Sequence, residues 1–394
     1  MKFIVAAVLA HVAYACLAAG YAAPDASSLD KAREEARTLL ADDFHSLNTG
    51  RVTLLELAGR VAGMAAAATN SPAMQRVLYE GAFNMYREAD NLKRAAENHV
   101  PFWINLGTDA ESEFAACPAG SFTMGFEGDP TDASFRHKVN ITRPFWIARH
   151  QTTKRLYDTF RKVLKMSDEE KAYGGMDSPV GGIPRVEIDA FCDFLTTRNK
   201  SRIPDGYVFR LPTDAEWEYA LNANCEDPED PYVRFKNGDK SVEDEIAVVL
   251  EDVNDARARH GLKAITSKDW VGPVFAVGTK RPNAWGLYDM LGNGAEMILD
   301  TLPLNAVKVD YGEGRLRREN VHNYQDEEND PLRFSGTGNV LLLLRGRPRW
   351  SRFAASWYCR TARIDYPKWS RGQVFRVALA PDILAERNAK EAEP

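Results

Sequence analysis

Two carboxylates flank a glycine turn in residues 286–297 (GLYDMLGNGAEM), the segment of this sequence whose residue types best suit a metal ion. Asp289 precedes the turn, Gly292 and Gly294 lie within it, and Glu296 follows. Carboxylate and backbone carbonyl oxygens are the hard ligands that calcium prefers. Spacing alone nevertheless favours an ordinary turn that carries two solvated acids.

Arginines form a second group of candidate binding residues near the C-terminus. Guanidinium groups bind sulfate, phosphate and carboxylate through paired hydrogen bonds. We therefore expect an anionic ligand, such as a sulfated or acidic glycan or an acidic peptide. The alternative is that these arginines pair with neighbouring acids such as Asp365 and line no pocket. The arginines are Arg345, Arg347, Arg349, Arg352 and Arg360, and we predict that Arg347, Arg349, Arg352 and Trp350 contact the ligand.

The cysteines do not suit a structural zinc site. Apart from Cys16 in the N-terminal segment, they are Cys117, Cys192, Cys225 and Cys359. They form no CxxC pair, and no histidine cluster accompanies them.

Residues 1–23 read as an export signal, with Lys2 followed by apolar and then small residues. His11, Tyr14 and Asp25 interrupt the ~20 apolar residues that a membrane span needs. We expect a periplasmic, cell-surface or secreted protein, with a lipoprotein anchored at Cys16 as the alternative.

The net charge of −6 gives no general attraction to nucleic acid, so we expect no such partner.

A length of 394 residues suits about two domains. Residues 24–100 have helical periodicity, with Ser28, Thr53 and the Ser71-Pro72 pair as predicted helix starts. These helices are candidates for self-association. After Pro101 the pattern changes to short apolar stretches, turns and two further helices, which predicts an α+β domain over residues 114–381. A polar tail, 382–394, follows.

Residues 210–220 (RLPTDAEWEYA) predict a well-capped helix. Thr213 and Glu216 form a capping box, in which each side chain accepts a hydrogen bond from the other residue's backbone N–H. Trp217, Ala220 and Leu221 are expected to face the core. This segment is predicted to be structural.

Taken together, these segments resemble the sulfatase-modifying-factor family, which includes the formylglycine-generating enzymes. The similarity runs from about Phe114 to about Ala380 in the family's order. It is carried by residues 118–125 (PAGSFTMG), 145–147 (FWI), 152–153 (TT), 179–180 (PV), 189–192 (DAFC), 210–220, 282–297, 345–346 (RG), Arg363 and 375–377 (FRV).

The resemblance implies a C-type-lectin-like fold with much irregular chain and with calcium as a cofactor. One implied calcium site uses Asp289 and Glu296 with the carbonyls of Gly292 and Gly294. A second uses Asn254 and Asp269 with carbonyls near Asp255 and Val271.

The copper chemistry of the family lacks its ligands in this sequence. Active members oxidise a cysteine of a client sulfatase with oxygen and a copper ion held by two thiolates, which suit Cu(I). Counting from Trp350 places the two cysteine positions at Arg352 and Trp357, whereas counting back from Arg363 places them at Trp350 and Ala355. Cys359 is therefore the single nearby candidate for catalysis. The resemblance also makes a Cys225–Cys359 disulfide a candidate.

Three functions remain open at this point. The first is a catalytically degenerate binding or scaffolding module for an anionic glycan or a protein partner. The second is a formylglycine-generating oxidase that works with copper and oxygen through Cys359. Copper is doubtful, because residues 346–349 (GRPR) and 295–297 (AEM) replace the family's Gly-Gly-Ser and Trp-Glu-Trp segments. The third is a surface or assembly component whose helical segment oligomerises and whose large domain presents loops such as residues 301–333.

Overall fold

The computed structural model describes residues 24–107, 110–125, 137–166, 175–237, 239–248, 275–303, 308–310, 315–317, 327–332, 340–346, 361–364 and 373–392. These residues belong to two compact units. One unit extends to residue 103 and includes 113–119 and 143–146, and the other comprises 104–112, 120–142 and 147 onward. The units therefore interleave along the chain, whereas the predicted domains were separated at a single place between residues 100 and 114.

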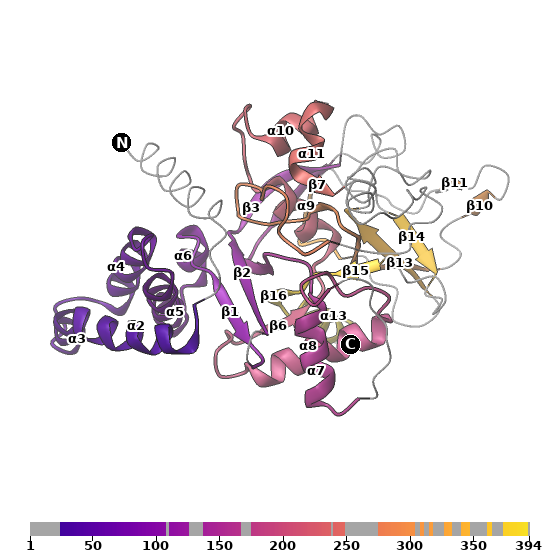
Figure 1. Ribbon diagram of the computed structural model, residues 1–394. Coiled ribbons are helices and arrows are strands. Elements are labelled where there is room, and N and C mark those ends of the chain that lie inside the picture. Colours follow the sequence, from indigo (N-terminus) through magenta and orange to yellow (C-terminus); the bar gives the residue numbers. More distant parts are fainter. Residues whose placement is uncertain are drawn as a thin grey trace, which may run out of the picture. The chain divides into compact units, whose positions relative to one another are not determined.

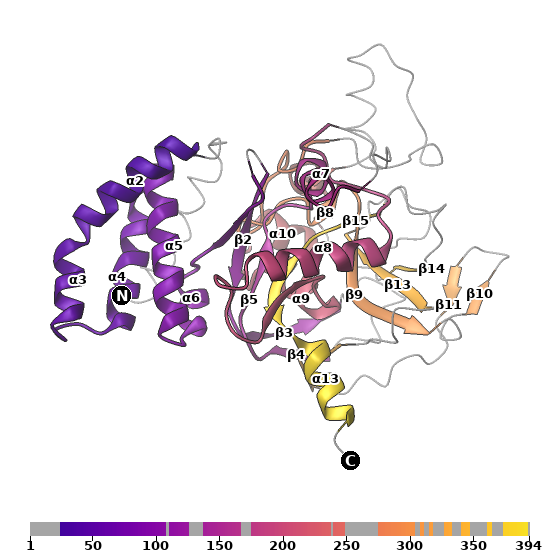
Figure 2. The same cartoon turned by 90° about the horizontal axis from the view of Figure 1, so that it is seen from below.

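The first unit contains the predicted helical segment (Figure 1). Its helices are α2 (Ala26–Leu39), α3 (Ala41–Asn48), α4 (Leu54–Ala67), α5 (Pro72–Glu88) and α6 (Leu92–Glu97). Helix α5 packs along α4 and α2, which lie beside it in Figure 2.

Two of the predicted helix starts are confirmed and one is wrong. Thr53 and Glu56 form a capping box on α4, and Ser71 caps α5 with Pro72 in its first turn. The cap of α2 is Asp25 rather than Ser28, because the Asp25 carboxylate accepts the Ser28 backbone N–H at 2.7 Å. Ser28 therefore lies inside the first turn.

An aromatic cluster completes the core of the first unit. Phe83 of α5 packs against Phe102 and Trp146, with ring centroids 5.0 and 5.3 Å apart. The Trp146 indole N–H donates to the carbonyl of Val100 at 2.8 Å. The buried indole is thereby satisfied, as a buried Trp requires.

The second unit mixes short strands with helices, and the predicted α+β class is confirmed (Figure 1). Its helices are α7 (Lys154–Val163), α8 (Arg185–Arg198), α9 (Asp214–Asn222), α10 (Pro231–Lys236), the 3-10 helix η2 (Lys240–Val242), α11 (Glu243–Ile246) and α13 (Ile383–Ala392). The strands of the chain are β1 (Phe102–Asn105), β2 (Glu111–Cys117), β3 (Gly120–Met124), β4 (His137–Ile141), β5 (Phe145–Ala148), β6 (Tyr207–Arg210), β7 (Ala247–Val248), β8 (Leu291–Gly292), β9 (Ala295–Pro303), β10 (Lys308–Asp310), β11 (Arg315–Arg317), β12 (Glu327–Asn329), β13 (Val340–Arg345), β14 (Thr361–Ile364), β15 (Gln373–Phe375) and β16 (Ala378–Pro381).

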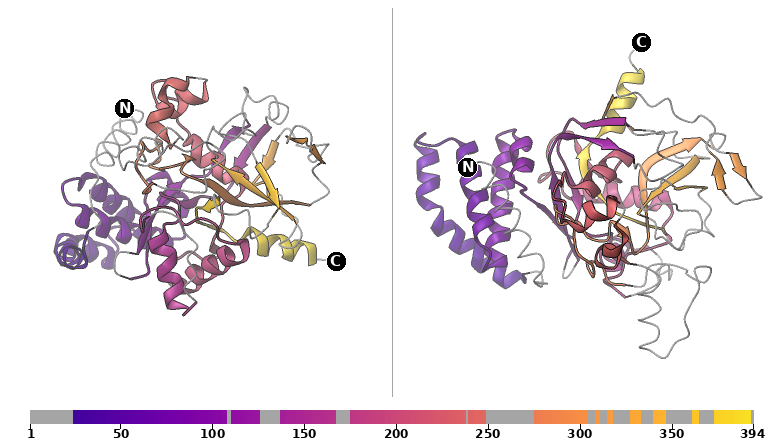
Figure 3. Two further views of the ribbon diagram at one scale, coloured as in Figure 1. Left: turned by 45° about the vertical axis from the view of Figure 1, so that its right-hand side comes forward. Right: turned by 90° about the horizontal axis from the view of Figure 1, so that it is seen from above.

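The sheet that matters most for the candidate site has the strand order β14-β13-β9-β15. Its strands have the orange to yellow colours in Figure 3. Strand β9 pairs antiparallel with β13 and parallel with β15, and in this register Glu296 lies between Arg345 and Val374. Paired residues of neighbouring strands point to the same face of a sheet. Helix α9 contacts both β9 and β13.

Other strands of the second unit pair as follows. Strand β4 lies between β3, antiparallel, and β12, parallel. Strand β6 pairs antiparallel with β16, and α8 packs against β6. Strands β7 and β8 form a two-stranded parallel sheet, and β10 and β11 an antiparallel one.

Gly346, directly after β13, allows a close backbone approach to the 286–297 turn. Its φ is +67°, and its carbonyl accepts the Gly292 N–H at 3.0 Å. A Cβ at this position would lie 2.6 Å from the Met290 carbonyl oxygen. We predict that Gly346→Ala destabilises the protein by about 2–4 kcal/mol, because it adds backbone strain to a steric clash.

Gly81→Ala in α5 is the matched control. A Cβ at Gly81 has nothing within 4 Å, so alanine there is expected to stabilise the helix by about 0.5–1 kcal/mol. Urea unfolding of both variants measures the difference. Equal stability of Gly346→Ala and the wild type would contradict the close approach.

Candidate functional site

Helix α9 is the element of the site that the sequence predicts best. The Thr213 hydroxyl accepts the Glu216 N–H at 3.1 Å, and Glu216 accepts the Thr213 N–H at 2.8 Å, so the capping box is confirmed. Arg210 holds the same carboxylate through two hydrogen bonds of 2.7 and 2.8 Å. Asp300 of β9 adds a further cap by accepting the Asp214 N–H at 2.7 Å. Trp217, Ala220 and Leu221 are buried, as predicted.

Arg345 belongs to the interior of the protein. Its side chain is fully buried and forms ion pairs with Asp214 and Glu218 of α9, the latter at 2.8 Å. Its guanidinium carbon lies 5.6 Å from the centre of the Trp217 ring, within the range of a cation–π contact. Arg345 therefore pairs with acidic side chains, which was the alternative to binding an anionic ligand. The acids are Asp214 and Glu218 instead of Asp365.

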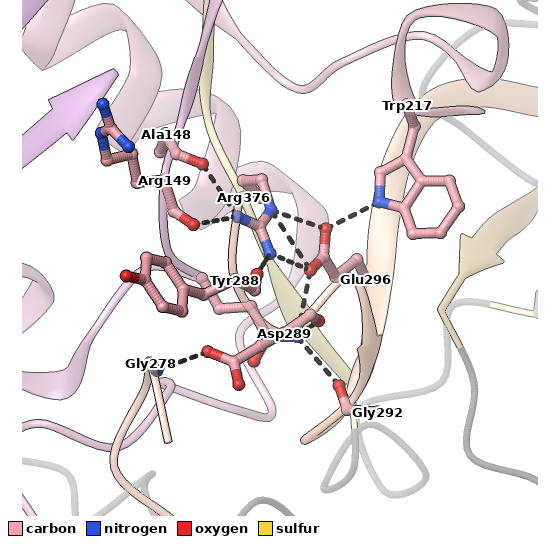
Figure 4. Close-up of polar contacts among 10 residues, drawn as sticks. Ala148, Arg149, Trp217, Gly278, Tyr288, Asp289, Gly292, Glu296 and Arg376 are labelled. Atoms are coloured by element: carbon pink, nitrogen blue, oxygen red, sulfur yellow. Dashed lines mark hydrogen bonds and ion pairs between the residues drawn. The ribbon is translucent and has the colours of Figure 1, made fainter. Parts of the chain in front are cut away.

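Glu296 forms a buried ion pair with Arg376 (Figure 4). The Arg376 Nη2 lies 2.8 Å from Glu296 Oε1, and the Arg376 Nε lies 3.1 Å from Oε2. Oε2 also accepts the indole N–H of Trp217 at 2.8 Å, and Oε1 accepts the amide of Gln151 at 3.0 Å. Both carboxylate oxygens therefore have donors, one of which carries a full positive charge.

The remaining donors of Arg376 bind backbone carbonyls. Its Nη1 donates to Ala148 and Arg149, each at 2.8 Å, and its Nη2 donates to Tyr288 at 2.6 Å (Figure 4). Arg376 thus connects the C-terminal end of β5, the 286–297 turn and the segment between β15 and β16. Because each donor is satisfied, the buried charge meets the condition under which such a pair is tolerated.

Asp289 occupies a different environment from Glu296, although the sequence places both at one turn. Its φ is +56°, in the left-handed region. Its Oδ2 accepts the Gly278 N–H at 2.7 Å, while its Oδ1 is buried and accepts no hydrogen bond from the described residues. Burial raises the pKa of this carboxyl to about 6, against the lowering effects of the Gly278 hydrogen bond and the Arg376 charge.

The described atoms of the turn do not fit the predicted calcium shell. Calcium takes six to eight oxygen ligands, and its affinity grows with their negative charge. Here the charge of Glu296 is compensated by Arg376, and the Gln151 amide nitrogen lies between the Glu296 carboxylate and the carbonyl of Gly292. Only Asp289 retains a buried carboxylate oxygen without a donor among the described residues at this turn. In the same described part of the chain, no cluster of three or more His, Cys, Asp or Glu side chains is placed to hold a metal.

The other predicted site residues lie outside the described ranges. They are Asn254, Asp255, Asp269 and Val271 of the second calcium site, Arg347, Arg349, Trp350 and Arg352 of the ligand site, and Cys359. Cys16 also lies outside these ranges. All of these assignments stay predictions.

The described cysteines are poor thiolate ligands. Cys117 and Cys192 are buried and Cys225 is half-buried, and all three carry free thiols. Burial raises the thiol pKa of both Cys192 and Cys225. The predicted Cys225–Cys359 disulfide stays a prediction, because Cys359 lies outside the described ranges. The neighbours of Cys225 include Asp227 and Asp230, whose negative charges further disfavour the thiolate.

Sequence reasoning missed the parts played by Gln151 and Arg376. Arg376 stood in a segment quoted for the family resemblance and Gln151 directly before one, yet neither was expected to contact Glu296. Their separation from Glu296 is 145 and 80 positions along the chain, respectively. Only a buried Glu in need of a positively charged partner could have signalled them, and the burial of Glu296 cannot be read from the sequence alone.

Comparison with known proteins identifies the family. The family model described as "Sulfatase-modifying factor enzyme 1-like domain" matches residues 107–329, which is more than half of the chain. The chain belongs to this family. The search of curated proteins found no match.

Three solved structures are similar to the chain. PvdO from Pseudomonas aeruginosa has 20% identity and a TM-score of 0.48, with 71% of this chain and 97% of PvdO covered. Treponema denticola variable protein 1 has 18% identity and a TM-score of 0.49, with coverage of 72% and 99%. CarF has 16% identity and a TM-score of 0.43, with coverage of 71% and 100%. Among the described residues, no helix combines the length and apolar character that a membrane crossing requires.

We predict that Glu296→Gln lowers the free energy of unfolding by about 3–5 kcal/mol, because it leaves the buried Arg376 charge without a counter-ion. Glu391→Gln is the matched control, since Glu391 pairs with Arg387 on the exposed surface of α13. That change is expected to cost no more than about 0.5 kcal/mol. Urea denaturation compares the two, and an equal loss in both variants would contradict the structural importance of the buried pair.

Proposed function

We propose that this chain is an exported family member that has lost copper-dependent cysteine oxidation and acts as a binding or scaffolding module. The observation that carries the proposal is the lack of a cysteine at either pair of positions counted for the copper ligands, Arg352 with Trp357 or Trp350 with Ala355. Copper(I) needs soft thiolate ligands, which arginine, tryptophan and alanine do not provide.

The described thiols support the same conclusion. Cys192 is fully buried on α8, and burial raises the pKa of its thiol. A thiol whose pKa is raised holds its proton and is a weaker metal ligand and nucleophile. Cys192 therefore does not replace a missing copper ligand.

An anionic glycan is the ligand class that the arginine segment favours. Arg345 forms buried ion pairs with Asp214 and Glu218, so the binding proposal rests on the arginines that follow it in the sequence. Residues 347–352 (RPRWSR) carry three guanidinium groups next to an indole. Guanidinium groups bind sulfate or carboxylate, and an aromatic ring provides an apolar surface for a sugar.

The test is binding of a sulfated heparin oligosaccharide to the wild type and to the triple variant Arg347→Ala/Arg349→Ala/Arg352→Ala. We expect the triple variant to bind at least about tenfold more weakly, since each charge-assisted hydrogen bond contributes about 1.5–3 kcal/mol. The control triple variant Arg33→Ala/Arg37→Ala/Arg387→Ala removes the same charge from exposed helix positions.

The pattern of affinities decides the outcome. A loss of heparin affinity in the Arg347/Arg349/Arg352 variant, with affinity retained in the control variant, supports a local anion site. Equal losses would indicate a general effect of charge, and no binding by the wild type would remove the glycan proposal. Selective binding of an acidic peptide by the same three arginines would instead assign the site to a protein partner.

The alternative function, a working oxidase, is tested separately. The protein is incubated with copper, oxygen and a sulfatase-type cysteine peptide, and the peptide is examined by mass spectrometry for an aldehyde. We expect no aldehyde. Aldehyde formation that is abolished by Cys359→Ser and retained in Cys192→Ser would overturn the binding-module proposal.

Calcium and self-association complete the proposal. Asn254 and Asp269, with carbonyls near Asp255 and Val271, remain the proposed structural calcium site, because they supply hard oxygen ligands. The helical segment α2–α6 is the proposed route of self-association. Export, with periplasmic, cell-surface or secreted location, rests on residues 1–23.

A further inference from the structure

We infer that the amide group of Gln151 replaces a metal ion in closing the 286–297 turn. Its Nε2 lies 3.3 Å from the Asp289 carbonyl oxygen, 3.2 Å from the Gly292 carbonyl oxygen and 3.0 Å from Glu296 Oε1. Three oxygens from the start, middle and end of the turn therefore converge on one nitrogen. This is the arrangement that oxygen ligands adopt around a cation, with a neutral N–H donor group at the centre.

Charge balance favours the amide over a divalent ion at this position. Glu296 is paired with Arg376, whose guanidinium is fully buried and donates to both carboxylate oxygens. A divalent ion bound to Glu296 would therefore lie next to a guanidinium that no solvent screens. Unlike charges attract and like charges repel far more strongly in such surroundings than in water.

The backbone on the C-terminal side of Gln151 is held by hydrogen bonds. The Thr152 N–H donates to the Phe375 carbonyl at 2.9 Å, and the Thr152 carbonyl accepts the Val180 N–H at 2.8 Å. Gln151 itself is only 1% exposed. The Gln151 side chain is therefore buried together with the three oxygens that its Nε2 contacts.

The substitution Gln151→Glu tests whether an amide or a cation occupies the position of the Gln151 Nε2. Gln151→Glu keeps the shape of the side chain and replaces the N–H donors with a carboxylate oxygen. Four oxygens would then face one another, an arrangement that calcium stabilises. We expect Gln151→Glu to bind about one more calcium per chain than the wild type and to lose thermal stability on addition of EDTA.

The experiment measures calcium content by elemental analysis, and the melting temperature in calcium and in EDTA, for the full-length protein. Gln75→Glu in α5 is the matched control for the added charge, and it is expected to resemble the wild type. A calcium ion at the proposed 254–271 site contributes equally to every variant, so it cancels in the comparison. This comparison does not depend on the proposed binding function.

Asp289→Asn provides a second, independent readout, because asparagine also tolerates a positive φ. The inference predicts the same calcium content in Asp289→Asn and in the wild type. A loss of about one calcium per chain in Asp289→Asn would show that the turn holds the ion, and would overturn the inference. An unchanged calcium content and unchanged EDTA response in folded Gln151→Glu would overturn it as well.

Discussion

The buried ion pair between Glu296 and Arg376 is the interaction on which the second unit depends most. A carboxylate and a guanidinium in the interior are stable only if each is fully hydrogen-bonded. Glu296 meets this condition with Trp217 and Gln151, and Arg376 meets it with three backbone carbonyls. These hydrogen bonds hold together four segments that lie far apart in the sequence: residues 148–151, helix α9 at Trp217, residues 288–296 and Arg376.

Trp217 extends this network to a second ion-paired group. Its indole N–H donates to Glu296, while its ring faces the guanidinium of Arg345, which pairs with Asp214 and Glu218. One helix, α9, thereby joins β9, β13 and the segment after β15. In a fold with short strands and much irregular chain, such buried polar contacts specify the arrangement of segments that regular sheet pairing alone leaves undetermined.

Sequence reasoning succeeded where the determinants were local. The start of α4 at Thr53, the capping box of α9 and the start of α5 at Ser71-Pro72 depend on residues within one helical turn, and all are confirmed. It failed where the partner was distant. The partner of Glu296 proved to be Arg376, and the partners of Arg345 proved to be acids of α9. Neither pairing could be predicted from spacing, because sequence distance does not determine which buried charges meet.

The same network changes how the family resemblance bears on function. It accounts for Glu296, a predicted calcium ligand, and for Arg345, a member of the candidate arginine group, since both side chains form buried ion pairs in the interior. The most direct measurement is a double-mutant cycle on Glu296→Gln and Arg376→Met, followed by urea unfolding in EDTA. The account predicts a coupling energy of about 2–3 kcal/mol, with the double variant much more stable than the sum of the single losses implies. Additive losses within about 0.5 kcal/mol would contradict it.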